Sequence, residues 1–154
     1  MNWFLEFLSN KVLISGLVAW LFAQTVKMII NIFTTHTFDL RRLVGDGGMP
    51  SGHSAMVLAV ATSSLILYGI GSFEFAISVI LAIIVTHDAT GVRRESGKHA
   101  HALNELAEYL KTLHFGEPAD QEKLKEFLGH THLQVIVGGV LGILTALFFC
   151  LVLK

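Results

Sequence analysis

The sequence predicts an all-α membrane protein, a polytopic bundle of about four transmembrane helices with one amphipathic interfacial helix. Hydrophobic residues make up 53% of the chain and charged residues only 15%, whereas soluble domains carry roughly 25% charged residues. The hydrophobic residues also gather into long runs, and an α-helix needs about 17–25 apolar residues to cross a bilayer. With 154 residues, we expect a single domain that spans residues 1–154.

Four apolar segments are the candidate spans. They cover about residues 12–33, 54–70, 73–87 and 133–153. The first and the fourth are long enough to cross a bilayer, whereas the second and third reach that length only with flanking residues. A tight helical hairpin that turns at Gly69-Ile70-Gly71-Ser72 is therefore an alternative for the second and third. The first ten residues predict either an interfacial segment or an extension of the first helix.

A further helix is expected between the third and fourth spans. Residues His99–Leu113 place leucines and a tyrosine at helical spacing, with glutamates and a lysine on the opposite side. This pattern predicts an amphipathic helix. We expect it to lie on the membrane face that carries the polar loops, where it would act as a lid.

Threading four spans through a bilayer brings three polar clusters to one face. These clusters are the glycine-rich loop after the first span, the polar stretch after the third, and the start of the fourth. Eight Lys and Arg residues lie on that side of the membrane and two on the other. The positive-inside rule therefore predicts that this face is cytoplasmic. Because the three clusters share a face, they are candidates for one site.

The composition also bears on the classes of partner. The net charge of −1 provides no basic field for a nucleic acid. Cys150 is the single cysteine, so the sequence has neither a disulfide framework nor a cysteine-based metal site.

The glycine-rich cluster, residues 45–54, joins two apolar runs. A helix is expected to begin near Ser51 or His53, and a helix N-terminus presents free N–H groups that suit an anion such as phosphate. The glycines allow further N–H groups to converge on one point. His53 would lie in the first turn, where a histidine can move a proton near neutral pH. An ordinary capped turn is the alternative.

Three basic residues that precede the glycine-rich cluster in the sequence are candidate phosphate ligands. Lys27 lies in the first span with Gln24 and Asn31 on the same helix face. This arrangement indicates either a buried polar stripe that faces the bundle or a lysine that snorkels to the headgroups. Arg41 and Arg42 precede the glycines and would grip phosphate, or would serve as a topology signal and contact lipid headgroups.

The polar stretch after the third span combines an acid with paired arginines. Asp88 would order an arginine; an aspartate with one adjacent histidine is a weak indication of a metal site. Arg93 and Arg94 would neutralise a dianion. The alternative for the two arginines is a solvated, positively charged flank of the span.

The fourth span opens with His130 and Gln134, one helical turn apart. A side-chain oxygen at that spacing would accept the ring N–H and leave the other ring nitrogen as a nucleophile. Gly138 and Gly142 follow as a small-xxx-small stripe, which favours close packing of helices within a membrane.

These motifs resemble the type 2 phosphatidic acid phosphatase superfamily, and more closely its divergent PAP2 membrane proteins. The similarity covers nearly the whole chain. The matching blocks are Gln24-x-x-Lys27, Gly47-Gly48-Met49-Pro50-Ser51, His53-Ser54-Ala55, Asp88-Ala89-Thr90-Gly91-Val92-Arg93-Arg94, Leu103-Asn104 and Leu128-Gly129-His130.

The resemblance implies a phosphatase mechanism that needs neither a metal nor another cofactor. It implies that His130 attacks phosphorus and forms a phospho-enzyme, and that His53 is the general acid on the leaving group. Positive groups would stabilise the transferring phosphoryl group. The implied phosphate ligands are Ser51, the Gly52 N–H, Lys27 and Arg42.

Two positions depart from the superfamily pattern. An arginine precedes the nucleophile by six residues in the superfamily, and Leu124 stands there in this chain, so Arg93 or Arg94 would supply the charge. An acidic residue follows the nucleophile by four, and here that residue is Gln134. Glutamine still accepts an N–H bond but cannot stabilise the imidazolium by charge. The superfamily also has six spans as a rule, whereas this chain allows about four.

The leading hypothesis is an integral membrane phosphatase that hydrolyses a lipid or amphiphilic phosphate ester or diphosphate through a phosphohistidine intermediate. Its polar face would lie in the cytoplasm, in a cell membrane or an organelle membrane. The alternative is a non-catalytic membrane protein that binds phosphorylated lipid or a partner protein, and a transporter or structural subunit is a third hypothesis. We expect the lipid bilayer and a phosphorylated amphiphile as partners, with a homodimer compatible with so small a bundle.

Overall fold

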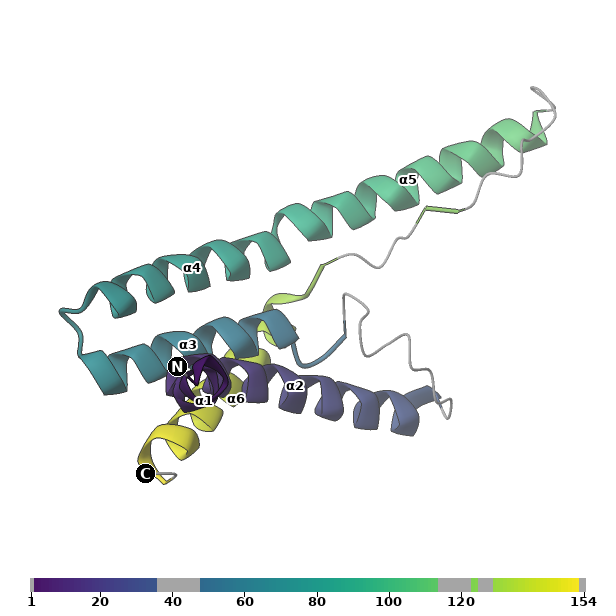
Figure 1. Cartoon of the computed structure of the whole chain (residues 1–154). Coiled ribbons are helices and arrows are strands. Elements are labelled where there is room, and N and C mark those ends of the chain that lie inside the picture. Colours follow the sequence, from purple (N-terminus) through teal and green to yellow (C-terminus); the bar gives the residue numbers. More distant parts are fainter. Residues whose placement is uncertain (1, 36–47, 114–122, 125–128, 153–154) are drawn as a thin grey trace.

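The computed structural model describes residues 2–35, 48–113, 123–124 and 129–152. Its helices, in chain order, are α1 (Trp3–Ser9), α2 (Lys11–Thr35), α3 (Gly52–Tyr68), α4 (Phe73–Thr90), α5 (Val92–Thr112) and α6 (His132–Leu151) (Figure 1). Within these ranges the chain forms no strand. The all-α prediction is therefore confirmed.

Three of the described stretches are long and apolar enough to cross a membrane, namely Lys11–Thr34, Phe73–Thr112 and His132–Leu151. The apolar part of the second stretch is α4. Helix α3 is apolar but has only 17 residues, which amounts to about 26 Å at 1.5 Å per residue. It is in contact with α2, α4 and α6. The four predicted apolar helices are thus present. Helix α3, which is shorter than the other three, contacts all of them.

The centre of the bundle is built from small residues. Ala19 and Ala23 of α2, Ala55 and Ala59 of α3 and Ala146 of α6 are completely buried and form one cluster. Helices attract each other only weakly through apolar burial in lipid, so close packing of small side chains and hydrogen bonds take over that role. A hydrogen bond of this kind joins the buried hydroxyls of Ser15 and Ser63, whose oxygens lie 2.6 Å apart.

The α3–α6 contact is the closest approach, and it uses the predicted glycine stripe. A Cβ atom on Gly138 would overlap the carbonyl oxygen of Ser51, and a Cβ atom on Gly142 would overlap that of Ala55. Glycine at these two positions therefore lets the backbones of α3 and α6 touch. By contrast, Phe22, Ile83 and Leu144 point outward and are more than half exposed, as expected for side chains that face lipid.

The predicted hairpin turn joins α3 to α4. Helix α3 ends at Tyr68 and is followed by Gly69, whose φ of +83° is one that residues with a side chain rarely adopt. Ser72 caps α4 by accepting a hydrogen bond from the N–H of Phe75 (3.2 Å). The two helices consequently lie side by side and antiparallel (Figure 1).

One of the two alternatives for the first ten residues is excluded, and the expected start and position of the amphipathic helix were wrong. Helix α1 is not an extension of the first span, because the side chain of Asn10 interrupts the helix and caps α2 through the N–H of Leu13 (3.1 Å). Helix α5 begins at Val92 instead of His99 and does not lie as a lid on the bundle. Among the described helices it contacts α4 alone, and it runs onward from the end of α4 (Figure 1).

The course of α5 has a local cause. Helical hydrogen bonds continue on both sides of Gly91. The N–H of Gly91 donates to the carbonyl of His87 (2.8 Å), and the carbonyl of Gly91 accepts the N–H of Glu95 (3.0 Å). A single residue between two helices leaves no loop in which the chain can reverse direction.

We predict that Gly142→Ala destabilises the bundle. Alanine is favoured over glycine inside a helix by roughly 1 kcal/mol, but here its Cβ would overlap the carbonyl oxygen of Ala55, and overpacking costs about 1–3 kcal/mol. The measurement is the melting temperature of the full chain in detergent. Gly71→Ala is the control, because a Cβ atom there meets nothing within 4 Å. Equal melting temperatures for the two variants would contradict the close contact of α3 and α6.

Candidate functional site

A cavity of about 100 Å³ lies where the start of α3, the α4–α5 junction and the residues before α6 meet. It is lined by His53, Val85, Asp88, Ala89, Arg93, Gly129 and His130. One water molecule occupies about 30 Å³ in the liquid, so the cavity has room for a few waters or one small polar group. The three polar clusters that the threading places on one membrane face thus contribute to one concavity.

His130 is held at the cavity by its backbone and by its ring. Only 4% of the residue is exposed. Its N–H donates to the carbonyl of Ala89 (2.9 Å), which ties the chain before α6 to the end of α4. Its ring Nδ1 lies 3.1 Å from Oε1 of Gln134, the pairing that the spacing predicts. An amide oxygen only accepts hydrogen bonds, so Nδ1 is the donor in this contact, and in the neutral ring the lone pair is then on Nε2.

Gln134 is itself fixed by the start of α6. Thr131 and Gln134 form a capping box, in which the Thr131 hydroxyl accepts the N–H of Gln134 (3.3 Å) and Oε1 of Gln134 accepts the N–H of Thr131 (3.1 Å). The same Oε1 therefore serves the helix cap and the ring of His130. Sequence reasoning missed this cap, although Thr followed by Gln three residues later is its signal.

Gly129 lets the segment before α6 press against the start of α5. Its φ is +91°, and a Cβ atom there would lie 2.6 Å from the backbone nitrogen of Arg94 and 2.9 Å from the carbonyl carbon of Arg93. The backbone at this point thus requires glycine for both conformation and space.

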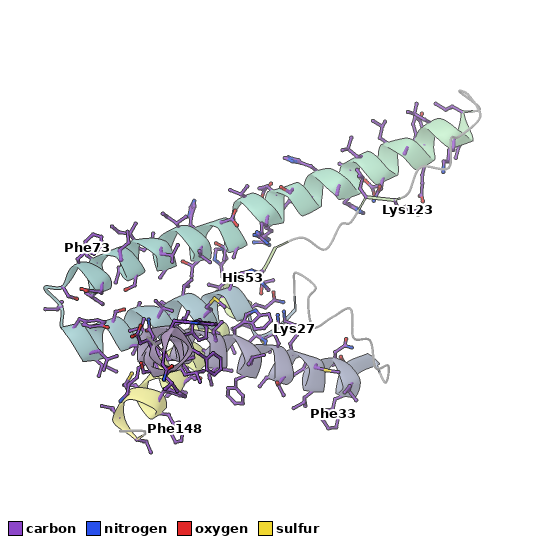
Figure 2. The ribbon with its side chains drawn as sticks, in the orientation of Figure 1. Lys27, Phe33, His53, Phe73, Lys123 and Phe148 are labelled. Carbon is purple, nitrogen blue, oxygen red and sulfur yellow. The ribbon has the colours of Figure 1, made fainter. Side chains whose placement is uncertain are left out.

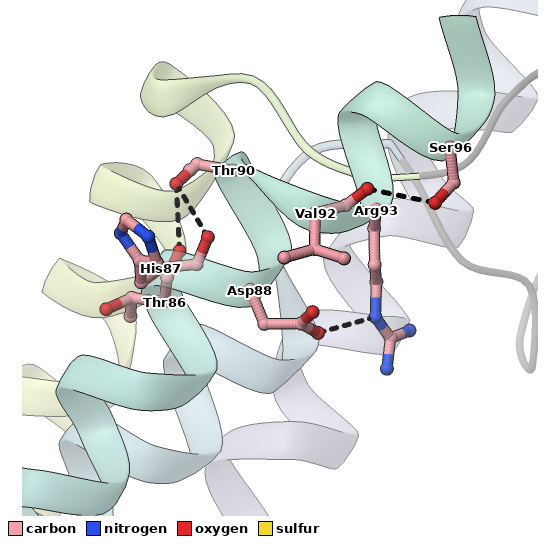
Figure 3. A network of polar contacts seen from close by, with 7 residues as sticks. All are labelled: Thr86, His87, Asp88, Thr90, Val92, Arg93 and Ser96. Carbon is pink, nitrogen blue, oxygen red and sulfur yellow. Dashed lines mark hydrogen bonds and ion pairs between the residues drawn. The ribbon is translucent and has the colours of Figure 1, made fainter. Parts of the chain in front are cut away.

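An ion pair spans the α4–α5 junction at the edge of the cavity. Nε of Arg93 donates to Oδ2 of Asp88 at 2.8 Å, and the two side chains are 42% and 40% exposed (Figure 3). A hydrogen bond at Nε sets the plane of the guanidinium group. Asp88 therefore orders an arginine, one of the roles expected for it. Arg94 is exposed and does not line the cavity, so the structure distinguishes the two adjacent arginines.

Ser51 and Gly52 form the beginning of α3 and do not line the cavity. Ser51 is completely buried, and its Oγ accepts hydrogen bonds from the N–H (3.4 Å) and the hydroxyl (3.0 Å) of Ser54. The serine therefore caps the helix, which begins where the sequence predicts. Gly52 is buried, and a Cβ atom on it would meet Trp20 and Gln24 of α2 at 3.2–3.6 Å.

Lys27 belongs to a buried polar stripe. It is only 7% exposed, and the methylene carbons of its side chain lie 3.5–3.9 Å from the Cβ position of Gly48. Gln24, one turn earlier, is also buried. The burial favours the stripe that faces the bundle over a lysine that reaches for the headgroups. Lys27 and His53 lie at the same end of the bundle (Figure 2). Arg42, together with Gly45 to Gly47, lies outside the described residues.

Glu95, beside the site, forms an ion pair with Lys98. On the exposed first turns of α5, the Lys98 ammonium donates a hydrogen bond to the Glu95 carboxylate (2.6 Å) and lowers the pKa of that carboxyl. Glu95 is therefore committed to Lys98. No group of three or more His, Cys, Asp or Glu side chains converges as a set of metal ligands within the ranges that the structure describes.

Comparison with known proteins identifies the relatives of this chain. Residues 8–145 match the model of the divergent PAP2 family. The chain is also 40% identical, over 151 residues, to the uncharacterized membrane protein YuiD of Bacillus subtilis (strain 168), an alignment that covers 93% of this chain and 96% of that protein. No solved structure matches. The chain therefore belongs to the divergent PAP2 family and is a membrane protein.

We predict that Gly129→Ala lowers the stability of the protein more than Gly69→Ala does. Both glycines have a positive φ, +91° and +83°, but a Cβ atom at Gly69 meets nothing within 4 Å whereas one at Gly129 collides with the start of α5. Gly69→Ala thus measures backbone strain alone, about 1–3 kcal/mol, and Gly129→Ala adds the collision. Melting temperatures in detergent provide the comparison, and an equal loss in both variants would argue against the contact.

Proposed function

We propose that this member of the divergent PAP2 family is a membrane-embedded phosphatase. It hydrolyses a lipid or amphiphilic phosphate ester or diphosphate through a phosphohistidine at His130. The observation that supports the proposal most is the convergence in one cavity of His53, Arg93 and His130. These three side chains come from three distant segments of the chain and are the types that phosphoryl transfer through a histidine requires.

The first half-reaction forms the phospho-enzyme. Nε2 of His130 attacks phosphorus with its lone pair, and the P–O bond to the leaving group breaks. His53 donates a proton to the leaving oxygen as the general acid. The hydrogen bond from Nδ1 to Gln134 holds the ring in the tautomer that this attack needs.

The second half-reaction regenerates the enzyme. A water molecule attacks the phosphorus of the phosphohistidine, and His53, now neutral, takes a proton from that water. The P–N bond to His130 breaks, its electron pair returns to Nε2, and inorganic phosphate leaves. His53 thus serves as acid and then as base, and the enzyme returns to its initial protonation state.

Arg93 supplies the positive charge for the phosphoryl oxygens. It lines the cavity, whereas Leu124, at the position of the superfamily arginine, does not. A guanidinium group carries several N–H donors in a rigid fork, and its Nε donates to Asp88. The fork geometry matches the oxygens of a phosphate, which makes arginine the side chain best suited to hold one here.

The position of the cavity favours an amphiphilic substrate at a bilayer surface. It lies at the ends of α3 and α4 and beside the start of α6, where a phosphate headgroup would reach it while its apolar tail stays in lipid. The basic residues on this side of the chain support a cytoplasmic orientation.

A second candidate function is binding of a phosphorylated lipid, or of a partner protein, without turnover. Gln134 favours it, because a neutral amide cannot stabilise the imidazolium that forms in the first step. The two candidates share the cavity and differ only in whether His130 reacts.

We predict that the purified full-length protein releases phosphate from phosphatidate or from a polyprenyl diphosphate, and that His130→Ala abolishes the release, because the nucleophile is gone. His132→Ala is the matched control, since His132 is exposed and lies two residues away. Phosphate release is measured in mixed micelles, and an acid-labile phospho-enzyme is sought by quenching. Equal rates for wild type and His130→Ala would refute the phosphatase.

We also predict that Gln134→Glu raises the turnover number roughly tenfold or more. A carboxylate there keeps the capping box with Thr131 and the acceptor for Nδ1 of His130, and adds the missing charge. In a serine-protease triad the acid-to-amide change costs about 10⁴-fold, in part through a wrong tautomer; the tautomer here is already correct, so the expected gain is smaller. If both forms bind phosphatidate vesicles and neither turns the lipid over, the binding function is the better description.

A further inference from the structure

Helix α5 carries a stripe of leucines on its surface. The stripe consists of Leu103, Leu106, Leu110 and Leu113, which are between 43% and 53% exposed. Among the described helices α5 contacts α4 alone, and that contact leaves the leucines open. A protein surface in water rarely carries a contiguous apolar patch of this kind unless a partner binds there.

The leucine stripe lies outside the membrane. Helix α4 has 18 residues, about 27 Å of helix, which already matches a hydrocarbon core of roughly 30 Å. Helix α5 runs onward from α4 (Figure 1), and Leu103 follows Gly91 by twelve residues, about 18 Å along the axis. The contact of Gly129 with the backbone of Arg94 holds the junction in this course. The leucines therefore stand in the aqueous layer beside the membrane.

The described part of the segment that returns toward α6 lies on the other side of α5. Nδ2 of Asn104 donates to the carbonyl oxygen of Leu124 (2.9 Å), and Nζ of Lys123 donates to Oε1 of Glu108 (2.7 Å). Figure 2 shows Lys123 alongside the distal part of α5. Successive residues of a helix are about 100° apart, so Asn104 and Glu108 lie roughly 140–180° from the middle of the leucine stripe. Residues 123 and 124 thus occupy the face opposite the stripe.

The spacing of the leucines is that of a helix–helix seam. Intervals of three, four and three residues separate Leu103, Leu106, Leu110 and Leu113, which places them at successive a and d positions of two heptads. A seam of this spacing pairs with a second helix that carries the same pattern. It therefore fits an α-helix as the partner.

The charges of α5 permit this partner to be a second α5. In a parallel pair of helices the positions beside the seam face each other, and like charges there would repel. Those positions are Ala102, Ala107 and Tyr109, which carry no charge at neutral pH. The glutamates lie away from the seam and are paired within the chain, Glu105 with His101 and Glu108 with Lys123.

We propose that the leucine stripe of α5 is the interface with a second copy of this chain, formed by two parallel α5 helices. Copies of a membrane protein enter the bilayer in one orientation, and α5 continues α4 in each, so two neighbouring α5 helices run parallel. Two heptads are fewer than the three or four that indicate a coiled coil in solution. Anchoring both helices in one membrane raises their effective concentration and compensates for the short seam. The proposal does not depend on the phosphatase.

The test is disulfide cross-linking of the full-length protein in the membranes of the expressing cells. Cys150→Ala first removes the single cysteine. In a symmetric parallel pair each d residue meets its own copy, so Leu106→Cys should form a disulfide-linked dimer upon oxidation. Glu105→Cys is the matched control, because its side chain points away from the seam. We expect roughly tenfold more dimer from Leu106→Cys, since a disulfide requires Cα atoms about 4–7 Å apart. Equal cross-linking of the two variants would overturn the proposal.

A second measurement is the mass of the protein in detergent micelles by light scattering. Wild type should contain two chains and Leu106→Asp one, because the substitution places two carboxylates opposite each other in the seam. Leu106 is exposed in the single chain, so the melting temperature of the monomer should not fall. Thr112→Asp adds the same charge on the opposite face and should stay dimeric. A monomeric wild type would contradict the interface, and so would quenching of a fluorophore at Leu106→Cys by spin-labelled lipid, which would place the stripe on the bilayer.

Discussion

The backbone contact between α3 and α6 is the constraint on which the site depends. Gly138 and Gly142 bring α6 against the carbonyls of Ser51 and Ala55, and the N–H of Ser51 donates to the carbonyl of Gln134 (3.0 Å). The start of α3 is therefore attached to the first turn of α6. Because His53 follows Ser51 by two residues and His130 precedes Gln134 by four, this single contact brings the two histidines to the same end of the bundle. A larger residue in the stripe would separate them before it disturbed either side chain.

The α4–α5 junction, which also lines the cavity, is attached to the start of α6 by backbone contacts as well. The carbonyl of Ala89 accepts the N–H of His130, and Gly129 lies on the backbone at the start of α5. Side chains then complete the site, with Asp88 setting the plane of Arg93 and Gln134 setting the ring of His130. Backbone contacts depend on glycines and on helix ends more than on particular side chains. This explains how a chain with few charged residues can hold the side chains of His53, Asp88, Arg93 and His130 around one cavity.

The sequence predicts the parts of this structure that depend on local pattern. Apolar length predicts α2 and α6, the glycine-rich turn predicts the α3–α4 hairpin, and the four-residue spacing predicts the His130–Gln134 contact. It fails where tertiary register decides. A serine before a helix is equally suited to bind phosphate or to cap the helix, and only the structure shows that the Ser51 hydroxyl turns toward Ser54. Adjacent residues of a helix point about 100° apart, so the choice between Arg93 and Arg94 depends on where α5 begins. The course of α5 likewise follows from one residue, Gly91, which the amphipathic pattern does not reveal.

The charges around the cavity favour an anionic ligand. Asp88 pairs with Arg93, so an uncharged ligand would gain little there, whereas a phosphate dianion offers the charge and the oxygens that a guanidinium group binds most strongly. Gln134 orients His130 without adding negative charge, so the ring does not repel an incoming phosphate as it would with a carboxylate behind it. In the proposed phosphatase, the same neutrality would leave the imidazolium of His130 without a counter-charge. On the proposed function, the site would bind a phosphate firmly and turn it over slowly, because Arg93 would stabilise the negative phosphoryl oxygens but, as a cation, could not compensate the imidazolium.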